Sequence, residues 1–372
     1  MAYMNVDEIE SALISLAAAY PATCQIITLP NPSIEGRTYH AVRLGTASAA
    51  EREGVLITGG VHAREWVGPE VCVSLAADLL EAYALGTGLT YGGKSFPSDQ
   101  VRAVMERLNI FIFADVNPDG RYHSQNIEAL WRRNRNPADS GGKPNCIGVD
   151  LNRNYDFLWD FPNLFAPSAI VETSTDPCDP SQTYRGSSPS SEPEVRNVVW
   201  MMDTYPRIRW FLDIHSYSEL ILYNWGDDEN QSSDPSMNFT NSSFDSLRGI
   251  DNDTAYREYL PPDDLTVFQS LTNRMSEAIS VVHGRAYTVQ QGFSLYATSG
   301  AGDDYAYSRH RRNSGKSQVF GFTIECGTSF QPPWSEAENI IREVSAGLLE
   351  FCRSAPDVTY PDKFILLMSQ IL

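Results

Sequence analysis

Three apolar runs of the chain are followed or ended by residues that can bind a metal ion or move a proton. His62 and Glu65 follow the run at 55–58, in the order His-Ala-Arg-Glu. His215 closes a second run and Glu325 a third. Zinc in hydrolases commonly takes three protein ligands and leaves a fourth position for water. These residues are therefore candidates for a hydrolytic zinc site with an additional carboxylate for acid–base chemistry.

Each of these residues has a plainer explanation when it is taken alone. A His-x-x-Glu pair is common in exposed turns, and a single histidine such as His215 is often a hydrogen-bonded core residue. Glu325 is harder to explain, because an apolar strand rarely carries a carboxylate inward without a partner or a task. A structural ion pair with an arginine is the alternative for Glu325. The conjunction of these residues at strand ends favours the metal site.

Two arginine-containing segments are candidates for anion binding. Arg132, Arg133 and Arg135 lie in Leu-Trp-Arg-Arg-Asn-Arg, and Arg153 is flanked by amides in Asp-Leu-Asn-Arg-Asn-Tyr. Guanidinium groups suit carboxylates and oxyanions because they donate two parallel hydrogen bonds. A peptidase that acts at a C-terminus needs one cation for the free carboxylate and another for the oxyanion. For Arg133 and Arg135, surface salt bridges with the surplus acids are the better interpretation.

These side chains must be positioned by strands that end near one another. Apolar runs predict buried strands at 55–58, 209–217 and 319–327, and another that begins at 109 and stops at the turn before 120. Helical periodicity is found at 7–19, 69–84, 193–204, 265–283 and 335–353. The alternation predicts one α/β domain around a parallel or mixed sheet, interrupted by polar insertions at 157–191 and 226–264. Ligands of such sheets bind beyond the carboxyl ends of the strands.

Composition excludes some classes of partner. The 372 residues contain 47 acids against 28 Lys and Arg, a formal net charge of −19. A nucleic-acid partner is not expected, because phosphate neutralisation requires a basic face. No apolar run approaches the roughly 18 residues needed to cross a bilayer, so no membrane association is expected. The N-terminus shows no basic segment followed by an apolar one, so no secretory signal is visible.

The motifs, taken together and in order, resemble the M14 zinc carboxypeptidases of the carboxypeptidase A/B type over residues 7–350. The segments that carry the resemblance are HAREW, NPDGR, LWRRNR, GVDLNRNYD, TYRG, SEPE, IHSYSE, LYATSGAGDDYAY and FTIECG. The resemblance implies a single α/β/α domain with a central mixed sheet of eight strands. We expect residues 1–355 to form the catalytic domain and 356–372 a C-terminal tail. The implied activity is zinc-dependent removal of the C-terminal residue from peptides and proteins.

Site residues follow from the resemblance one position at a time. His62, Glu65 and His215 match the ligands of the Zn²⁺ cofactor. Glu325 matches the general base that takes a proton from water. Arg132 matches the arginine that polarises the scissile carbonyl and stabilises the oxyanion.

Substrate-binding positions are implied in the same way. Asn152 and Arg153 match the pair that binds the terminal carboxylate, Tyr296 the mobile tyrosine that closes over the substrate, and Arg64 a secondary substrate-binding position. Asp303 matches the residue at the base of the specificity pocket, where an acid is typical of enzymes that prefer C-terminal Lys or Arg. Its alternative is an acid bonded to backbone in the loop. The resemblance also implies a Cys146–Cys178 disulfide.

Several expectations concern the protein's setting and the alternatives to this function. The family resemblance implies peptide or protein C-termini as partners, a monomer, and a secreted or extracellular location. A silent relative that binds C-termini without cleaving them is the alternative from another class, although all three ligands and Glu325 are present. A peptidase for bacterial wall peptides or for polyglutamate tails is the alternative among enzymes. We expect Cys72 to be a small buried hydrophobe, and acidic loops such as 227–229 and 251–253 to be solvated rather than calcium-binding.

Overall fold

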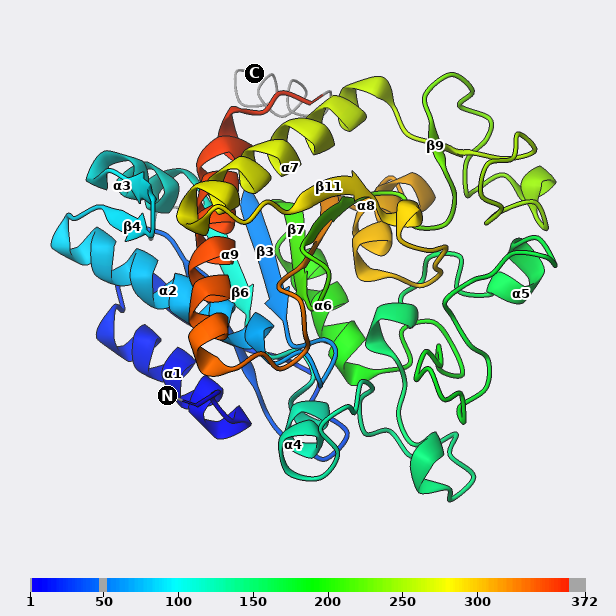
Figure 1. The fold of residues 1–372 in the computed structure, drawn as a ribbon, viewed down its shortest axis with the longest axis horizontal. Helices are drawn as coiled ribbons and strands as arrows, with labels where there is room; N and C mark the ends of the chain where they lie inside the picture. Colours follow the sequence, from blue (N-terminus) through cyan, green and yellow to red (C-terminus); the bar gives the residue numbers. More distant parts are fainter. Residues whose placement is uncertain (1, 47–51, 361–372) are drawn as a thin grey trace.

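A computed structural model describes residues 2–46 and 52–360, which form a central sheet between two layers of helices (Figure 1). The eight strands lie in the order β1-β2-β6-β3-β7-β12-β8-β11. The strands β6, β3, β7 and β12 are mutually parallel, whereas β2 and β8 run antiparallel to their neighbours β6 and β12. Their bounds are β1 Cys24–Thr28, β2 His40–Leu44, β3 Gly54–Gly59, β6 Asn109–Phe113, β7 Ile208–His215, β8 Leu220–Tyr223, β11 Thr288–Gln291 and β12 Phe320–Glu325. The predicted mixed eight-stranded sheet is confirmed.

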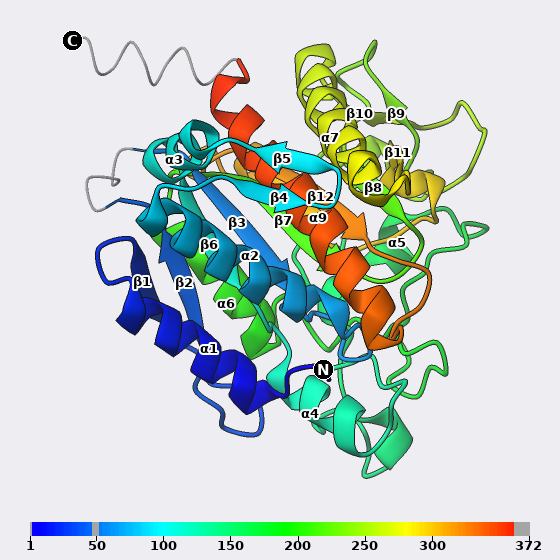
Figure 2. The same cartoon turned by 60° about the vertical axis from the view of Figure 1, so that its left-hand side comes forward.

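Helices cover both faces of this sheet. The helices α1, α2, α7 and α9 lie over one face, and α6 and α8 lie over the other (Figures 1 and 2). The helices are α1 Val6–Ala19, α2 Val67–Leu85, α3 Ser98–Arg107, α4 Pro118–Asn126, α5 Phe161–Leu164, α6 Pro193–Thr204, α7 Pro262–His283, α8 Gly302–Arg312 and α9 Trp334–Ser354. All five helices predicted from periodicity are present.

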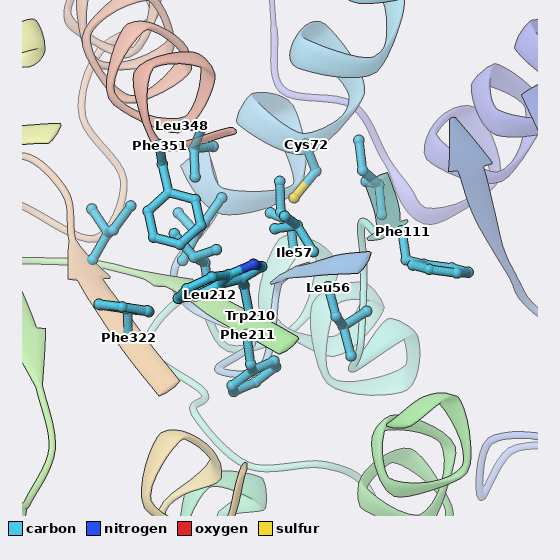
Figure 3. Close-up of a cluster of buried hydrophobic side chains, with 14 of the residues drawn as sticks. Leu56, Ile57, Cys72, Phe111, Trp210, Phe211, Leu212, Phe322, Leu348 and Phe351 are labelled. Atoms are coloured by element: carbon cyan, nitrogen blue, oxygen red, sulfur yellow. The ribbon is translucent and has the colours of Figure 1, made fainter. Parts of the chain in front are cut away.

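The central strands are buried on both faces because side chains alternate between two helical layers. Figure 3 shows Trp210 and Phe322 directed toward Phe351 of α9, while Phe211 points to the opposite side. Cys72 of α2 lies in the same core, fully buried and unbonded to another cysteine, as expected. Each such buried aromatic or aliphatic side chain contributes about 1.5–3 kcal/mol, which makes the sheet centre a rigid platform.

The two polar insertions contain little regular structure. The only α-helix of the first insertion is α5. The predicted Cys146–Cys178 disulfide is present and joins this insertion to the segment that precedes it. The second contains the two-residue strands β9 (Asn230–Gln231) and β10 (Glu258–Tyr259), which pair with each other. A separate hairpin is formed by β4 (Leu89–Tyr91) and β5 (Lys94–Phe96). The expectation of a solvated loop at 227–229 is wrong for Asp227 and Asp228, which are buried.

The described part of the expected tail packs on the domain. The ring of Tyr360 contacts Trp210 and Phe320, and its hydroxyl donates to Glu53 Oε1 at 2.8 Å. Residues 361–372, including the apolar run at 364–368, lie outside the described residues. Among the helices of the described part of the chain, none is both long and apolar enough to cross a membrane.

Candidate active site

The strand ends that carry the candidate residues meet at one edge of the sheet. In the parallel pairing of β12 with β7, Glu325 lies opposite His215, and in the pairing of β3 with β7, Gly59 lies opposite Ile214. The chain leaves β3 through Gly59 and Gly60. A Cβ at Gly59 would lie 2.9 Å from the carbonyl carbon of Gly68, and Gly60 has a φ of +71°. This tight passage between β3 and α2 sets the turn that carries His62 and Glu65.

The ligand atoms of three side chains converge where these elements meet. His62 Nδ1 lies 2.8 Å from Glu65 Oε1, and His215 Nδ1 lies 3.0 Å from Glu65 Oε2. The two Nδ1 atoms are themselves 3.0 Å apart. Among the described residues, this is the one group of three or more His, Cys, Asp or Glu side chains whose ligand atoms all lie within 4.8 Å of one another. Metal–ligand bonds of about 2 Å would place neighbouring ligands at comparable separations.

The opposite nitrogen of each imidazole faces a carboxylate. His62 Nε2 lies 3.1 Å from Asp150 Oδ1, and His215 Nε2 lies 2.8 Å from Asp213 Oδ2. When each Nε2–H donates to its acid, both Nδ1 atoms present lone pairs toward each other and toward Glu65. Such convergence of electron pairs is repulsive without a cation and is the donor arrangement that zinc requires. The residues therefore fit a zinc ion.

Arg132 is fixed beside this group by Asp150. Its Nε donates to Asp150 Oδ2 at 2.9 Å, and its Nη1 lies 3.7 Å from Glu65 Oε1. Although burial opposes ionisation, Arg132, His62 and Arg153 hold the pKa of Asp150 well below its usual range. A buried, ionised Asp150 thus orients one imidazole and one guanidinium at the same time.

Glu325 lies at the rim of the group and is only partly exposed. Burial raises the pKa of its carboxyl to about 8, against the opposing charges of His215 and Arg132 and with the added repulsion of Glu65. A bound dication would lower this pKa, because it favours the carboxylate. Burial thus favours the neutral acid and a bound dication the carboxylate, so the side chain is placed both to take up and to release a proton, as acid–base catalysis requires.

A second cluster lies where the loop after α4 meets the segment before α8. Asn152 Oδ1 accepts from Gly302 N at 2.8 Å, which directs its amide NH₂ away from that bond. Arg153 donates through Nε to Glu172 O, and through Nη1 to Asn152 O at 2.6 Å. Its guanidinium carbon lies 5.9 Å from the ring centroid of Tyr296, whose side chain is 38% exposed. Arg153 thus contacts both Asn152 and Tyr296, the other two predicted residues of this group.

Arg64 and Asp303 contact different parts of the chain. The guanidinium of Arg64 stacks over the ring of Phe330 at 4.2 Å, and burial lowers its pKa. Asp303, in the first turn of α8, is half-buried; its Oδ2 accepts from Thr323 Oγ1 at 3.0 Å and its Oδ1 from Asp304 N at 2.9 Å. Thr323 is two residues before Glu325, so it shares a face of β12 with the carboxylate of the site.

A comparison with known protein families identifies the family of this chain. The model of the zinc carboxypeptidase family, Peptidase_M14, matches residues 9–347. The chain belongs to this family.

Curated relatives of this zinc carboxypeptidase include both specificity types. The chain is 29% identical to carboxypeptidase B of Astacus astacus, in an alignment that covers 87% of the chain and 89% of that relative. It is 26% identical to carboxypeptidase A2 of Rattus norvegicus over 82% of the chain, but spans only 60% of that protein's length. The chain is thus a metallocarboxypeptidase, and the family implies zinc as its cofactor.

Solved carboxypeptidases share its fold. The carboxypeptidase A of Helicoverpa armigera superposes with a TM-score of 0.72 at 23% identity, covering 96% of this chain and 74% of that one. Bovine thrombin-activatable fibrinolysis inhibitor, in complex with a tick carboxypeptidase inhibitor, gives 0.69 at 21% identity, covering 94% of this chain and 96% of that one. At these sequence identities, the similarity shows a shared fold alone.

The sequence-based predictions missed two residues of this carboxypeptidase and misplaced a third. Asp150 and Asp213 were not predicted, although Asp213 precedes His215 by two residues on a buried strand and therefore shares its face. Arg133 was predicted to be at the surface, which is wrong: it is buried and donates to Pro177 O at 2.6 Å and to Asn145 O at 2.8 Å. Arg135 does face an acid, with its Nε 3.9 Å from Glu35 Oε1.

Proposed function

We propose that the chain hydrolyses the C-terminal peptide bond of peptides and proteins, with zinc held by His62, Glu65 and His215. The observation that carries this proposal is the convergence of two imidazole Nδ1 atoms on one carboxylate, each imidazole backed by an acid. When bound there, zinc supplies a Lewis acid that polarises the scissile carbonyl and makes water more acidic.

In this proposal, Glu325 and Arg132 perform the chemical step. Glu325 takes a proton from the attacking water and passes it to the leaving amine as the carbon–nitrogen bond breaks. Arg132 donates hydrogen bonds to the oxyanion that develops on the carbonyl oxygen, and Asp150 keeps its guanidinium in one orientation beforehand. Because this orientation precedes substrate binding, little reorganisation is needed in the transition state.

The free carboxylate of the substrate is assigned to Asn152 and Arg153. Two nitrogens of Arg153 are engaged by backbone carbonyls, which fixes the plane of the guanidinium and leaves Nη2 for a ligand. The exposed ring of Tyr296 is placed to cover a ligand bound at Arg153. Arg64, held against Phe330, is assigned to a more distant part of the substrate.

We further propose a preference for basic C-terminal residues, with Asp303 as its determinant. Asp303 is half-buried near the carboxyl end of β12, and its hydrogen-bond partners Thr323 and Asp304 N leave lone pairs on both oxygens. A carboxylate there favours a cationic side chain over an apolar one of similar shape. The match to a carboxypeptidase B supports this proposal, while the matches to A-type relatives support an apolar preference as the alternative.

The activity is tested with paired peptides that differ only in a free or an amidated C-terminus. Amidation should lower kcat/KM by more than about a hundredfold, because it removes a charge-assisted pair with Arg153. Chelation of zinc should abolish release, and Glu325→Gln should lower kcat by about two to four orders of magnitude. Equal cleavage of both peptides would identify an endopeptidase, and near-normal turnover of the Glu325 variant would exclude it as the base.

The specificity proposal is tested with matched peptides ending in Arg, Lys, Leu and Phe. Wild type should favour Arg and Lys, and Asp303→Ala should lower the Arg:Leu ratio of kcat/KM. Asp99→Asn removes an exposed acid from α3 and is the matched control. A wild-type preference for Phe, or an unchanged ratio in Asp303→Ala, would exclude Asp303 as the determinant.

We also propose a setting for the protein. The Cys146–Cys178 disulfide supports an extracellular location, because disulfides persist in oxidising compartments. We propose a monomer that acts on peptide or protein C-termini. The division into a catalytic domain at 1–355 and a tail from 356 is retained as a proposal, and truncation after residue 355 tests it through the unfolding midpoint.

A further inference from the structure

A group of buried acids lies where the second insertion meets the start of α8. Asp227 and Asp228 follow β8, Glu258 belongs to β10, and Asp304 belongs to the first turn of α8. We refer to these four residues as the acidic cluster. Each is at most 1% exposed. Four carboxyl groups withdrawn from water require a compensating charge, a proton or hydrogen-bond donors, because an uncompensated buried charge is costly.

Backbone and side-chain donors compensate three members of the cluster. Asp228 accepts from Glu229 N at 2.7 Å and from Gly249 N at 2.6 Å. Glu258 accepts from Phe239 N at 3.1 Å and from the hydroxyl of Tyr256. Asp304 accepts from Asn224 Nδ2 at 2.7 Å and from Gly226 N at 3.2 Å.

Asp227 differs from the other three. Both of its carboxylate oxygens are buried and accept no hydrogen bond from any residue in the described part of the chain. The carboxyl groups of Asp227 and Glu258 lie within direct reach of each other. The buried Oδ1 of Asn224, three residues earlier in the same loop, also lacks a described donor. Two residues of the loop that follows β8 thus carry buried oxygens without a described donor.

Arg248 acts on the cluster through its charge but forms no ion pair with it. None of its four members forms an ion pair with a Lys, Arg or His among residues 2–46 and 52–360. The charge of Arg248 acts on Asp227 and Glu258, but its guanidinium pairs with Asp245 at 2.8 Å and with the carbonyls of Leu164 and Asn241. Burial raises the pKa of all four carboxyl groups, and a bound dication would favour their charged forms instead.

We propose that Asp227, together with Asn224 and Glu258, forms a calcium-binding site that fixes the 226–264 insertion to the start of α8. Calcium accepts carboxylate, amide and carbonyl oxygens at variable geometry, whereas magnesium demands a near-octahedral set. The cluster offers oxygen ligands alone, which disfavours zinc. Only two acidic side chains bind the ion directly, in accord with the absence of a third acidic ligand within 4.8 Å among the described residues.

The surroundings of the cluster suggest a function for the site. A hollow of about 380 Å³ is lined by Glu229, Asn230 and Gln291, and Gln291 donates to Trp225 O at 2.9 Å and to Asp228 O, beside the cluster. The cation would fix Asn224, whose Nδ2 donates to Asp304 Oδ1 at 2.7 Å, next to Asp303 in the sequence. It therefore stabilises the element that carries the proposed specificity residue without touching the substrate.

The first experiment measures calcium binding to zinc-loaded protein. The protein is passed over a chelating resin, restored with one equivalent of zinc, and titrated with calcium or magnesium while bound metal and the unfolding midpoint are recorded. We expect one calcium per chain. The midpoint should rise by about 3 °C or more at about a hundredfold excess over the dissociation constant, because a ligand of the folded state stabilises it by mass action. Magnesium should give a smaller shift.

Variants then locate the site. Asp227→Asn should lower calcium affinity at least tenfold and abolish the midpoint shift, while the exposed Asp99→Asn should bind as wild type does. Asn224→Ala gives a second, milder test, and zinc content should stay at one equivalent in each folded variant. No bound calcium in wild type, or unchanged binding in Asp227→Asn, would overturn the proposal. A calcium-insensitive wild type that Asp227→Asn stabilises would show that a shared proton compensates the cluster instead.

Discussion

Asp150 is the residue on which the metal group and the oxyanion group both depend. One of its oxygens faces His62 Nε2 at 3.1 Å and the other accepts from Arg132 Nε at 2.9 Å. It also accepts from Asn152 N at 3.0 Å, which positions the segment that carries Arg153. A single ionised carboxylate therefore sets the orientation of a proposed ligand, an oxyanion donor and a carboxylate-binding residue.

We predict that Asp150→Asn weakens zinc binding about 10- to 100-fold, the usual effect of removing a carboxylate behind a histidine ligand. It should also lower kcat at saturating zinc, because Arg132 loses its charge-assisted bond. Competition with a zinc chelator and steady-state kinetics measure the two effects separately.

Asp213→Asn is the matched control, because Asp213 contacts His215 and Thr58 but not Arg132. It should weaken zinc binding to a similar degree and leave kcat at saturating zinc closer to wild type. If both variants lower kcat equally at full zinc occupancy, Asp150 does not act through Arg132.

At the residue scale, motifs predicted the side chains that bear the chemistry but not those that orient them. His62, Glu65, His215 and Glu325 follow from residue type and from strand ends. The role of Asp150 depends on a contact between residues 88 positions apart, which no local pattern encodes. The prediction for Arg133 was wrong for a related reason. Its hydrogen-bond acceptors are carbonyls on two separate loop arms, and an arginine-rich stretch of sequence does not indicate such acceptors.

The disulfide and Arg133 act as one element that closes the first insertion. Cys146 and Cys178 are separated by 32 positions, and Arg133 binds the carbonyl of the residue that precedes each of them. The covalent bond and the two hydrogen bonds thus hold the same pair of loop arms. Their contributions to stability should therefore depend on each other.

We predict that a Cys146→Ser and Cys178→Ser variant loses about 3–4 kcal/mol of unfolding free energy, as expected for a loop of this length. Arg133→Met leaves two carbonyls unpaired and should cost about 2 kcal/mol. The combined variant should lose less unfolding free energy than the sum of the two separate losses. The reason is that loop arms released from the disulfide no longer depend on Arg133. Chemical denaturation of the four proteins measures the coupling; strict additivity would mean that Arg133 stabilises some other contact.

Helix α6 introduces a buried acid whose ionisation opposes folding. Glu194 is fully buried near Glu192, Asn134 and Asp119, and its Oε1 has no described donor. Burial, then repulsion from Glu192 and Asp119, raises its pKa to about 8, while the bond from Asn134 Nδ2 at 3.1 Å lowers it. The pKa of Glu194 is lower in the unfolded chain than in the folded protein. The free energy of unfolding is therefore greatest below the pKa of the unfolded chain, and this contribution is lost as the pH rises through about 8.

We predict that Glu194→Gln removes this loss. Relative to wild type, the variant should gain stability between pH 5 and pH 8.5, on the order of 3 kcal/mol, because each pKa unit corresponds to about 1.4 kcal/mol. The exposed Glu81→Gln should show no such gain. Denaturant midpoints at several pH values provide the measurement, and a pH-independent difference would mean that Glu194 is not protonated in the folded state.

At the element scale, long periodic segments were predicted well and short or polar ones were not. The helix predicted at 193–204 has those bounds in the structure, whereas α8 was missed. Its sequence, GDDYAYSRHRR, is too polar for an apolar stripe, although acids in its first turn and bases in its last suit the helix dipole. The edge strand β11 was missed because its four residues carry no alternation of apolar side chains.

At the scale of the whole molecule, the formal charge of −19 creates a negative field around the protein. This field should raise the local concentration of cationic peptides whatever residue they end in. The effect of Asp303, by contrast, should be confined to the terminal side chain. The two influences are separable, because salt screens fields over about 8 Å at physiological ionic strength and affects partly buried contacts less.

We predict that a peptide ending in Leu, with lysines placed several residues upstream, is cleaved with a KM that rises about tenfold between low and high salt. Its kcat should change little, since the charges lie far from the scissile bond. A matched peptide with uncharged residues upstream should show a nearly constant KM and corrects for effects of salt on the enzyme itself. Asp303→Ala should retain the salt dependence of the lysine-containing peptide while losing the preference for terminal Arg. If the two peptides respond alike to salt, the surplus of acids serves solubility rather than substrate attraction. If Asp303→Ala removes the salt dependence, then one local carboxylate, rather than the summed charge of the molecule, attracts the substrate.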